Sequence, residues 1–204
     1  MLLYKIIKYF NKEVNTMIKN KLLIVVDMQN DFLFGTLANK EGIAIIPQMQ
    51  DEIRQYKEDG NAVVFTRDTH VENYMETEEG KNLPVPHCIK GTEGWEITSY
   101  LKEFIDEDTE IFDKVTFGSD ALYNYLDNFG YEFDEIKLVG VCTDICVIAN
   151  AVLAKTACPN THIVVDASLC AGVTPESHET ALKAMEALQI EVTHKGEEVW
   201  KHIN

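Results

Sequence analysis

Short apolar runs rich in β-branched residues alternate with amphipathic segments along most of the chain. Runs of this length and composition are typical of parallel strands that are buried on both faces of a sheet. The runs are KLLIVVD ending at Asp27, NAVVFTRD ending at Asp68, TEIFDK ending at Lys114, EIKLVGV ending at Val141, HIVVDA ending at Ala167 and IEVTH ending at His194. We predict that each run is a strand of one sheet.

The segments between the runs have the spacing of helices. In PQMQDEIRQYKEDG, Pro47 fits the first helical turn and Gly60 a C-terminal cap, and Thr174 opens the helix of PESHETALKAMEAL. Alternating strands and helices form right-handed βαβ units, which place helices on both faces of a parallel sheet. We therefore expect a single-domain three-layer α/β/α sandwich with a mostly parallel sheet over residues 21–204, after an N-terminal extension, residues 1–20, of unknown role.

The stretch 69–96 breaks this alternation, because it is rich in Gly, Pro, Asn and charge. Loops longer than about 12 to 15 residues in a compact domain are usually functional or disordered. Apolar residues at Leu83, Val85, Ile89 and Trp95 favour an ordered loop here. This loop is our first candidate for a functional site.

Composition and charge narrow the function classes. The 18 basic and 34 acidic residues give a formal charge of −16, which argues against a nucleic acid or an anionic membrane surface as partner. No run approaches the roughly 18 apolar residues that span a bilayer. The five cysteines, without an evident secretory signal, indicate a reducing compartment, and we expect a cytoplasmic protein.

Polar residues at the carboxyl ends of the predicted strands carry the candidate chemistry, because ligands of doubly wound sheets bind at that edge. Asp27, Asp68 and Lys114 each close a strand, and Cys146 follows the fourth one. Their coincidence at one edge predicts a site.

Cys146 has two interpretations. Thr143 or Asp144 can cap a helix whose first turn contains Cys146, and a helix N-terminus favours the nucleophilic thiolate. Backbone N–H groups there, with that of Cys142, are suited to stabilise a tetrahedral oxyanion. The alternative is that Cys142 and Cys146 are small apolar residues packed between strand and helix.

Asp27 and Lys114 are equally open to two interpretations. A carboxylate at the end of a buried strand is either a satisfied loop cap or a base with a raised pKa. Lys114 is either a solvated strand-end lysine or a cation that holds a thiolate and orients a carboxylate.

The loop also contains a possible metal site. Asp68 and His70 lie two residues apart in RDTH, His87 follows in LPVPHC, and Glu79 lies between them. Such ligands suit zinc, iron or manganese, of which we favour zinc, although a loop histidine is often only solvated. The remaining histidines have no partner pattern and are interpreted as structural: His162, His178, His194 and His202.

Together these residues resemble the isochorismatase-like cysteine hydrolases and, within them, the nicotinamidases. The resemblance extends from about Lys21 to about Val192. Its markers are IVVDMQNDF at 24–32, FTRDTH at 65–70, EGKNLPVPHCIKGTEGWE at 79–96, DKVTFGS at 113–119 and GVCTDICV at 140–147.

The resemblance implies a catalytic triad of Asp27, Lys114 and Cys146 in this sequence. It implies a cis peptide between Val141 and Cys142, with the Cys142 N–H in the oxyanion site. It also implies a divalent metal, whose ligand set is absent from metal-free relatives. Phe32 is implied to form a wall of the substrate site by stacking on the ring. The metal ligands are Asp68, His70 and His87, with Glu79 matching a ligand that only some members use.

The expected function is the hydrolysis of nicotinamide to nicotinate and ammonia through a cysteine thioester, as in NAD salvage. A related cysteine amidohydrolase that acts on another small amide is the alternative. A non-catalytic scaffold would not need all three triad residues, and Cys142 and Cys146 do not form the C-x-x-C spacing of a thiol redox protein. The family and the helix-rich surface suggest a homo-oligomer.

Overall fold

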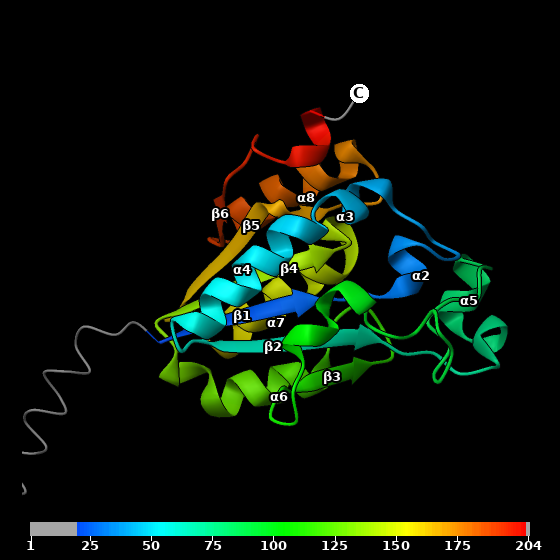
Figure 1. The fold of residues 1–204 in the computed structure, drawn as a ribbon, viewed down its shortest axis with the longest axis horizontal. Helices are drawn as coiled ribbons and strands as arrows, with labels where there is room; N and C mark the ends of the chain where they lie inside the picture. Colours follow the sequence, from blue (N-terminus) through cyan, green and yellow to red (C-terminus); the bar gives the residue numbers. More distant parts are fainter. Residues whose placement is uncertain (1–19, 203–204) are drawn as a thin grey trace, which may run out of the picture.

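A six-stranded parallel sheet forms the centre of the computed structural model, which describes residues 20–202 (Figure 1). The strand order is β3-β2-β1-β4-β5-β6, with every neighbouring pair parallel. The strands are β1 (Lys21–Val26), β2 (Ala62–Asp68), β3 (Ile111–Lys114), β4 (Glu135–Val141), β5 (His162–Ala171) and β6 (Glu191–Thr193). The predicted α/β/α sandwich is confirmed.

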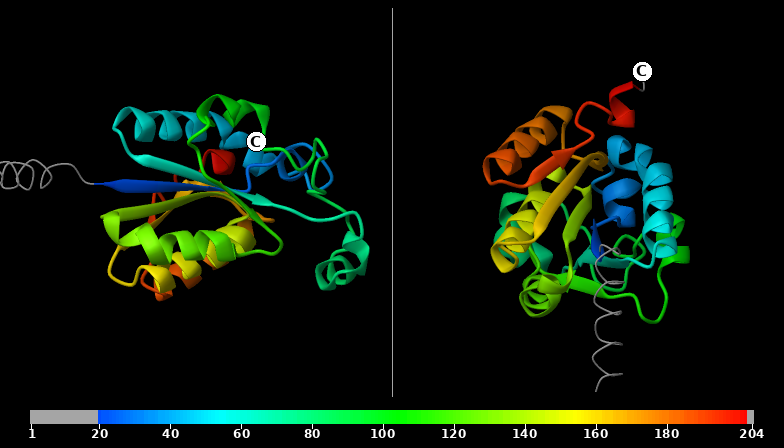
Figure 2. Two further views of the ribbon diagram at one scale, coloured as in Figure 1. Left: turned by 90° about the horizontal axis from the view of Figure 1, so that it is seen from below. Right: turned by 90° about the vertical axis from the view of Figure 1, so that its left-hand side faces the viewer.

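Helices cover both faces of the sheet (Figure 2). One face carries α2 (Asn30–Leu33), α3 (Lys40–Ala44), α4 (Ile46–Glu58), η2 (Ser99–Phe104) and η5 (Val199–His202). The other face carries α6 (Asp120–Phe129), α7 (Ile148–Ala157) and α8 (Pro175–Ala187). Shorter turns complete the chain: η1 (Tyr74–Glu76), α5 (Glu78–Asn82), η3 (Gly130–Glu132) and η4 (Thr143–Val147).

The alternation of side chains along each strand divides the core into two layers. In β1, Leu23 and Val25 pack towards α4, whereas Leu22, Ile24 and Val26 pack towards α6, α7 and α8. Both layers are almost fully shielded from solvent, which explains the continuous apolar runs in the sequence.

Most predicted ends of the elements hold, although β1 and β6 each end one residue earlier than predicted, at Val26 and Thr193. Pro47 lies in the first turn of α4, Gly60 follows it with φ +74°, and Thr174 caps α8. The fifth strand was expected to end at Ala167, but β5 continues to Ala171. It does so because β4 and β5 resume pairing beyond an irregularity at Gly140, where φ is +119°.

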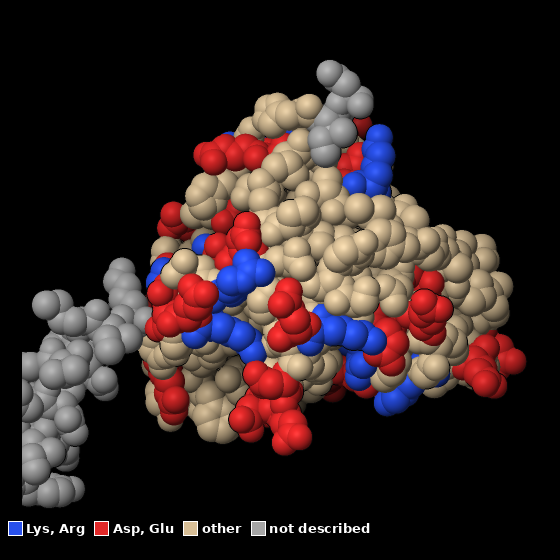
Figure 3. All heavy atoms as spheres, viewed as in Figure 1, with Lys and Arg blue, Asp and Glu red and all other residues tan. Residues whose placement is uncertain are grey.

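Within residues 20–202, no helix is both long enough and apolar enough to cross a membrane. Charged side chains gather over the lower and left parts of the face in Figure 3, and a broad area at its centre and right is mostly uncharged. The N-terminal extension lies outside the described residues, except for Asn20.

Candidate active site

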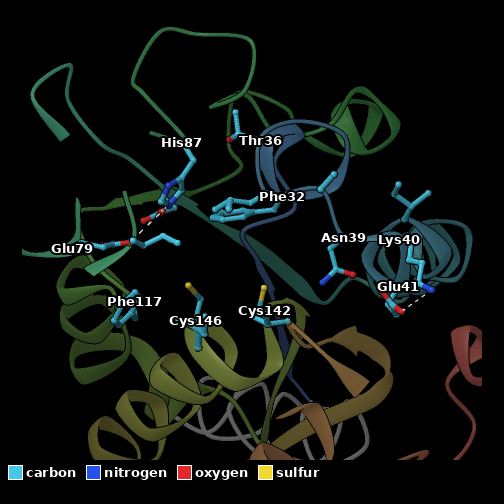
Figure 4. A pocket seen from close by; sticks show the side chains of 17 residues that line it. Phe32, Thr36, Asn39, Lys40, Glu41, Glu79, His87, Phe117, Cys142 and Cys146 are labelled. Carbon is cyan, nitrogen blue, oxygen red and sulfur yellow. Dashed lines mark ion pairs between the residues drawn. The ribbon is translucent and has the colours of Figure 1, made fainter. Parts of the chain in front are cut away.

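A cavity of about 840 Å³ opens at the carboxyl ends of the strands, where the sequence placed the candidate chemistry (Figure 4). Its lining includes Cys142 and Cys146 from the turn after β4, and Asp68, Glu79 and His87 from the loop region that follows β2. The predicted loop 69–96 is ordered and carries η1 and α5. The two groups of candidate residues therefore share one cavity.

Cys146 lines this cavity, and Lys114 and Asp27 lie behind it. The Lys114 Nζ atom lies 2.7 Å from Asp27 Oδ2 and 3.4 Å from Cys146 Sγ. The side chain of Thr66 donates a hydrogen bond of 2.7 Å to Asp27 Oδ1. Asp27 and Lys114 are almost completely buried, so the ammonium group has a carboxylate and a thiol as close neighbours and little contact with water.

The strand ends determine this geometry. β1 and β3 are both parallel to β2, so Asp27 after β1 and Lys114 at the end of β3 reach the same edge. Asp27 has a φ of +49°, in the left-handed region that a short polar side chain tolerates better than most. From the end of β3, Lys114 contacts Asp27 and Cys146, and its Nζ atom also lies 3.2 Å from Asp68 Oδ1.

Burial and charge set the protonation of the three groups. Burial raises the pKa of the Cys146 thiol well above its ordinary value, and the nearby Asp27 carboxylate raises it further. Burial also raises the pKa of Asp27, against the opposing charge of Lys114. Burial lowers the pKa of Lys114, but the charges of Asp27, Cys146 and Asp68 outweigh it, so the pKa is raised and the amine stays cationic.

The turn that carries Cys146 differs from the prediction. Cys146 lies in η4, a wide π-helical turn in which the Cys142 carbonyl accepts hydrogen bonds from the N–H groups of Ile145 and Val147, and α7 begins after it. Neither proposed cap is made, because Thr143 contacts His178 and Asp144 accepts from the Val173 N–H.

The cis peptide between Val141 and Cys142 is present as predicted. A helix N-terminus was expected to favour the thiolate of Cys146, whereas burial and the Asp27 charge raise the pKa of this thiol. The thiol therefore needs a base beside it before it can act as a nucleophile.

Asp68, His70, Glu79 and His87 form the second cluster, and one ligand atom from each lies within 4.8 Å of the others. His87 Nδ1 lies 2.8 Å from the Val85 carbonyl oxygen, which orients Nε2 towards the cluster. Buried His70 Nε2 has no hydrogen-bond partner, although it lies 2.9 Å from Asp68 Oδ2. Two imidazole nitrogens and two carboxylates directed at one point fit a divalent metal.

A model of the isochorismatase domain matches residues 21–197. The chain belongs to the isochorismatase family. It is 30% identical to the nicotinamidase/pyrazinamidase of Mycobacterium tuberculosis over 186 residues, which cover 84% of this chain and 97% of that enzyme. A probable inactive nicotinamidase of Arabidopsis thaliana is 27% identical over 184 residues, covering 84% of this chain and 91% of that one.

Solved structures of the family show the same fold. The pyrazinamidase of Pyrococcus horikoshii in complex with zinc is 32% identical and superposes with a TM-score of 0.73, covering 85% of this chain and 98% of that one. The nicotinamidase of Bacillus subtilis is 29% identical with a TM-score of 0.72 and covers the same shares of the two chains. The overall fold of this isochorismatase-family chain therefore has counterparts of known structure.

Two buried amide side chains that hold the site together were not predicted from the sequence. Gln29 donates hydrogen bonds to the carbonyls of Asp68 and Trp95 and accepts one from the Asp68 N–H. Asn150 donates to the carbonyl of Cys146 at 2.8 Å and accepts from the N–H of Ser119 at 2.9 Å. The sequence features that could have indicated them are the amide side chain two residues after Asp27 and the polar residue four positions after Cys146.

The remaining candidates separate into cavity lining and core. Phe32 lines the cavity, with its ring 5.6 Å from that of His87. Trp95 is core, because it is buried under the Arg67 guanidinium and donates a hydrogen bond to Thr69. His178 is buried between Thr143 and Glu198, in keeping with a structural role.

Proposed function

We propose that this amidohydrolase converts nicotinamide to nicotinate and ammonia through a thioester on Cys146. The observation that carries the proposal is that Cys146, which contacts Lys114 and through it Asp27, lines the same cavity as Asp68, Glu79 and His87 of the metal-type cluster. The names of the relatives support the same reaction. A non-catalytic role, as in the Arabidopsis relative, would leave this buried arrangement without a use.

The first half of the reaction forms the thioester. Asp27 accepts the proton of the Cys146 thiol as the sulfur attacks the carboxamide carbon, while Lys114 keeps its charge and holds the two groups together. The backbone N–H groups of Cys142 and Cys146 stabilise the oxyanion. Asp27 then returns the proton to the departing ammonia, and the carbon–nitrogen bond breaks.

The second half regenerates the enzyme. Asp27 accepts a proton from a water molecule that attacks the thioester carbon, and the same N–H groups stabilise the second oxyanion. The carbon–sulfur bond breaks, Asp27 passes the proton to the departing sulfur to restore the Cys146 thiol, and nicotinate leaves with its acid proton lost to solvent. The same carboxylate thus acts twice, which a buried position beside the thiol allows.

Residues of the second cluster would recognise the ring. Asp68, His70, Glu79 and His87 would hold a divalent metal, zinc by preference, that supplies a Lewis acid for the pyridine nitrogen and withdraws electrons from the amide. Phe32 covers the ring by stacking. The remaining expectations, a cytoplasmic protein and a homo-oligomer, stay predictions.

The pH dependence of the reaction follows from Asp27. The mechanism needs its carboxylate form, and burial raises the pKa of Asp27 above the ordinary value of 3.8. The value of kcat/KM for nicotinamide should therefore fall as the pH decreases through this raised pKa, with a midpoint above pH 3.8. Initial rates at fixed metal occupancy check this, and a midpoint at or below that pH would count against Asp27 as the base.

Metal removal tests the proposal as a whole. Protein that is verified metal-free should lose about 100-fold in kcat/KM for nicotinamide, and added zinc should restore it. Benzamide, which lacks the ring nitrogen, should be a poor substrate in both states. Ammonia release gives the rates, and full activity towards nicotinamide in metal-free protein would remove Asp68, His70 and His87 from the mechanism.

A related cysteine amidohydrolase with another substrate is the second candidate. The observation that favours it is the cavity, whose volume of about 840 Å³ is near the upper end of the about 300 to 1,000 Å³ typical of sites for drug-sized ligands. A monocyclic carboxamide needs only part of that space.

A further inference from the structure

The cavity continues beyond the space that a pyridine carboxamide needs. Its lining reaches from His87 and Glu79 at one side to Asn39, Lys40 and Glu41 at the other (Figure 4). The far part, which we term the α3 arm, is bounded by Ile43 and Glu41 of α3, by Val173, and by Cys142 and Ile145 of the turn after β4.

The reacting thiol divides the cavity between these two ends. In Figure 4, Cys146 lies between the metal-type cluster and α3, and Cys142 lies on the side of α3. A substrate whose acyl part is held at His87 and Glu79 places its scissile carbon at Cys146. The α3 arm is then the space beyond the scissile carbon, on the side away from the acyl part, and ammonia is too small to use it.

The walls of the α3 arm are mixed in character. Ile43, Ile145 and Val173 supply apolar surface, and Asn39 is already engaged, since it bonds to the Gly172 carbonyl and the Gly42 N–H. An arm of this kind suits an aliphatic chain rather than a second charged group along its length.

Lys40 and Glu41 are the charged exceptions in this lining, and the Glu41 carboxylate is paired only loosely, with Lys40. Its side chain is only 17% exposed, and the nearest cation is Lys40 Nζ at 3.7 Å, on a side chain that is 90% exposed. No hydrogen bond from residues 20–202 reaches the Glu41 carboxylate. A largely buried carboxylate beside open space favours a ligand that brings a positive charge or a hydrogen-bond donor.

We propose that the α3 arm binds the leaving amine of secondary carboxamides, and that Glu41 contacts an ammonium group at the end of a short alkyl chain on the amide nitrogen. The proposal rests on the proposed function for the position of the acyl part. It assigns this protein a substrate class, N-aminoalkyl carboxamides, beyond primary amides.

The chemistry needs no additional reactant. Cys146 sulfur attacks the carbonyl carbon, the carbon–nitrogen bond breaks, and Asp27 passes the thiol proton to the amine nitrogen. Water then cleaves the thioester, so one amide and one water give one carboxylic acid and one diamine.

Three amides test the proposal: nicotinamide, N-(2-aminoethyl)nicotinamide and N-propylnicotinamide. The last two have nearly the same shape, but only the aminoethyl chain ends in a positive charge. With zinc-loaded full-length protein, the release of nicotinate from each gives kcat/KM. We expect the aminoethyl amide to be hydrolysed with a kcat/KM about tenfold above that of the propyl amide.

Two variants and one control localise the effect. Glu41→Gln should remove the tenfold preference for the aminoethyl amide, because it keeps the shape and loses the charge. Ile43→Trp should narrow the arm and lower kcat/KM for both secondary amides at least about tenfold relative to nicotinamide. Glu58→Gln, an exposed change in α4, should leave all ratios as in the wild type.

The outcomes separate the two proposals. Hydrolysis of nicotinamide without hydrolysis of either secondary amide would overturn the α3 arm and leave the proposed function standing. Equal rates for the aminoethyl and propyl amides, or a preference that survives in Glu41→Gln, would overturn the role of Glu41. Hydrolysis of the aminoethyl amide without that of nicotinamide would support the arm and contradict the proposed function, and hydrolysis of none would contradict both.

Discussion

Replacement of Cys146 by alanine should lower kcat for nicotinamide by a factor on the order of 10⁴ to 10⁶, as for the loss of nucleophiles in other covalent hydrolases. The variant retains the oxyanion site and the metal-type cluster, but no atom remains to form the thioester. Cys146 borders the cavity, so the change should alter the thermal unfolding temperature only slightly. Ammonia release, corrected for the uncatalysed rate, gives the measurement.

Cys158 offers a matched control for this change. It is also a buried thiol in the layer of α6, α7 and α8, but its Sγ contacts the Leu126 carbonyl and it does not line the cavity. Cys158→Ala should therefore keep kcat within about a factor of two to three. Appreciable turnover by Cys146→Ala in a folded sample would refute the assignment of the nucleophile.

The second large effect is expected for Asp27→Asn, with a loss of about 10² to 10⁴ in kcat. The amide keeps the shape of the side chain and can still accept a hydrogen bond from Thr66, but it cannot take the thiol proton. Removal of the negative charge also leaves Lys114 with Asp68 as its remaining carboxylate neighbour. Single-turnover rates with nicotinamide should show the loss in the acylation step.

A carboxylate in β3 serves as the control for Asp27→Asn. Asp113 precedes Lys114 in β3 and pairs with Arg67 at 2.7 Å, outside the cavity. Asp113→Asn should change kcat by no more than a small factor. A near-normal rate in Asp27→Asn would mean that another group accepts the proton.

Much of this fold could be predicted from the sequence because its signals are local. The apolar runs from Leu22 to Val26 and from Val63 to Phe65 describe strands buried on both faces, and their alternation with helices leaves few possible topologies. The same reasoning placed Asp27 and Lys114 at one edge, since parallel strands share the direction of their carboxyl ends.

Features that depend on contacts between distant segments could not be predicted. In the π-helical turn at Cys146, Thr143 bonds to His178 and Asp144 accepts from the Val173 N–H, so the local cap signals at Thr143 and Asp144 were misleading. The direction of the thiol pKa depends on burial and on the Asp27 charge, and neither can be read from the sequence around Cys146.

The buried amides were missed for a similar reason. Gln29 bonds to Asp68 and Trp95, which are 39 and 66 positions away in the chain. Asn150 bonds to Ser119 and Phe117, which are 31 and 33 positions away. Glu41 likewise has no motif, and only the shape of the cavity draws attention to it. Sequence patterns thus indicated the candidate reactive groups, and the structure added the contacts that hold them in place.

Rapid-quench mass spectrometry of the enzyme during turnover tests the central claim most directly. Zinc-loaded protein is mixed with excess nicotinamide. When acylation is faster than thioester hydrolysis, the protein should release a burst of ammonia equal in amount to the active sites. During the burst, the peptide that contains Cys146 should carry a nicotinoyl thioester. A burst of ammonia with an unmodified Cys146 peptide, or with the nicotinoyl group on another residue, would contradict the account.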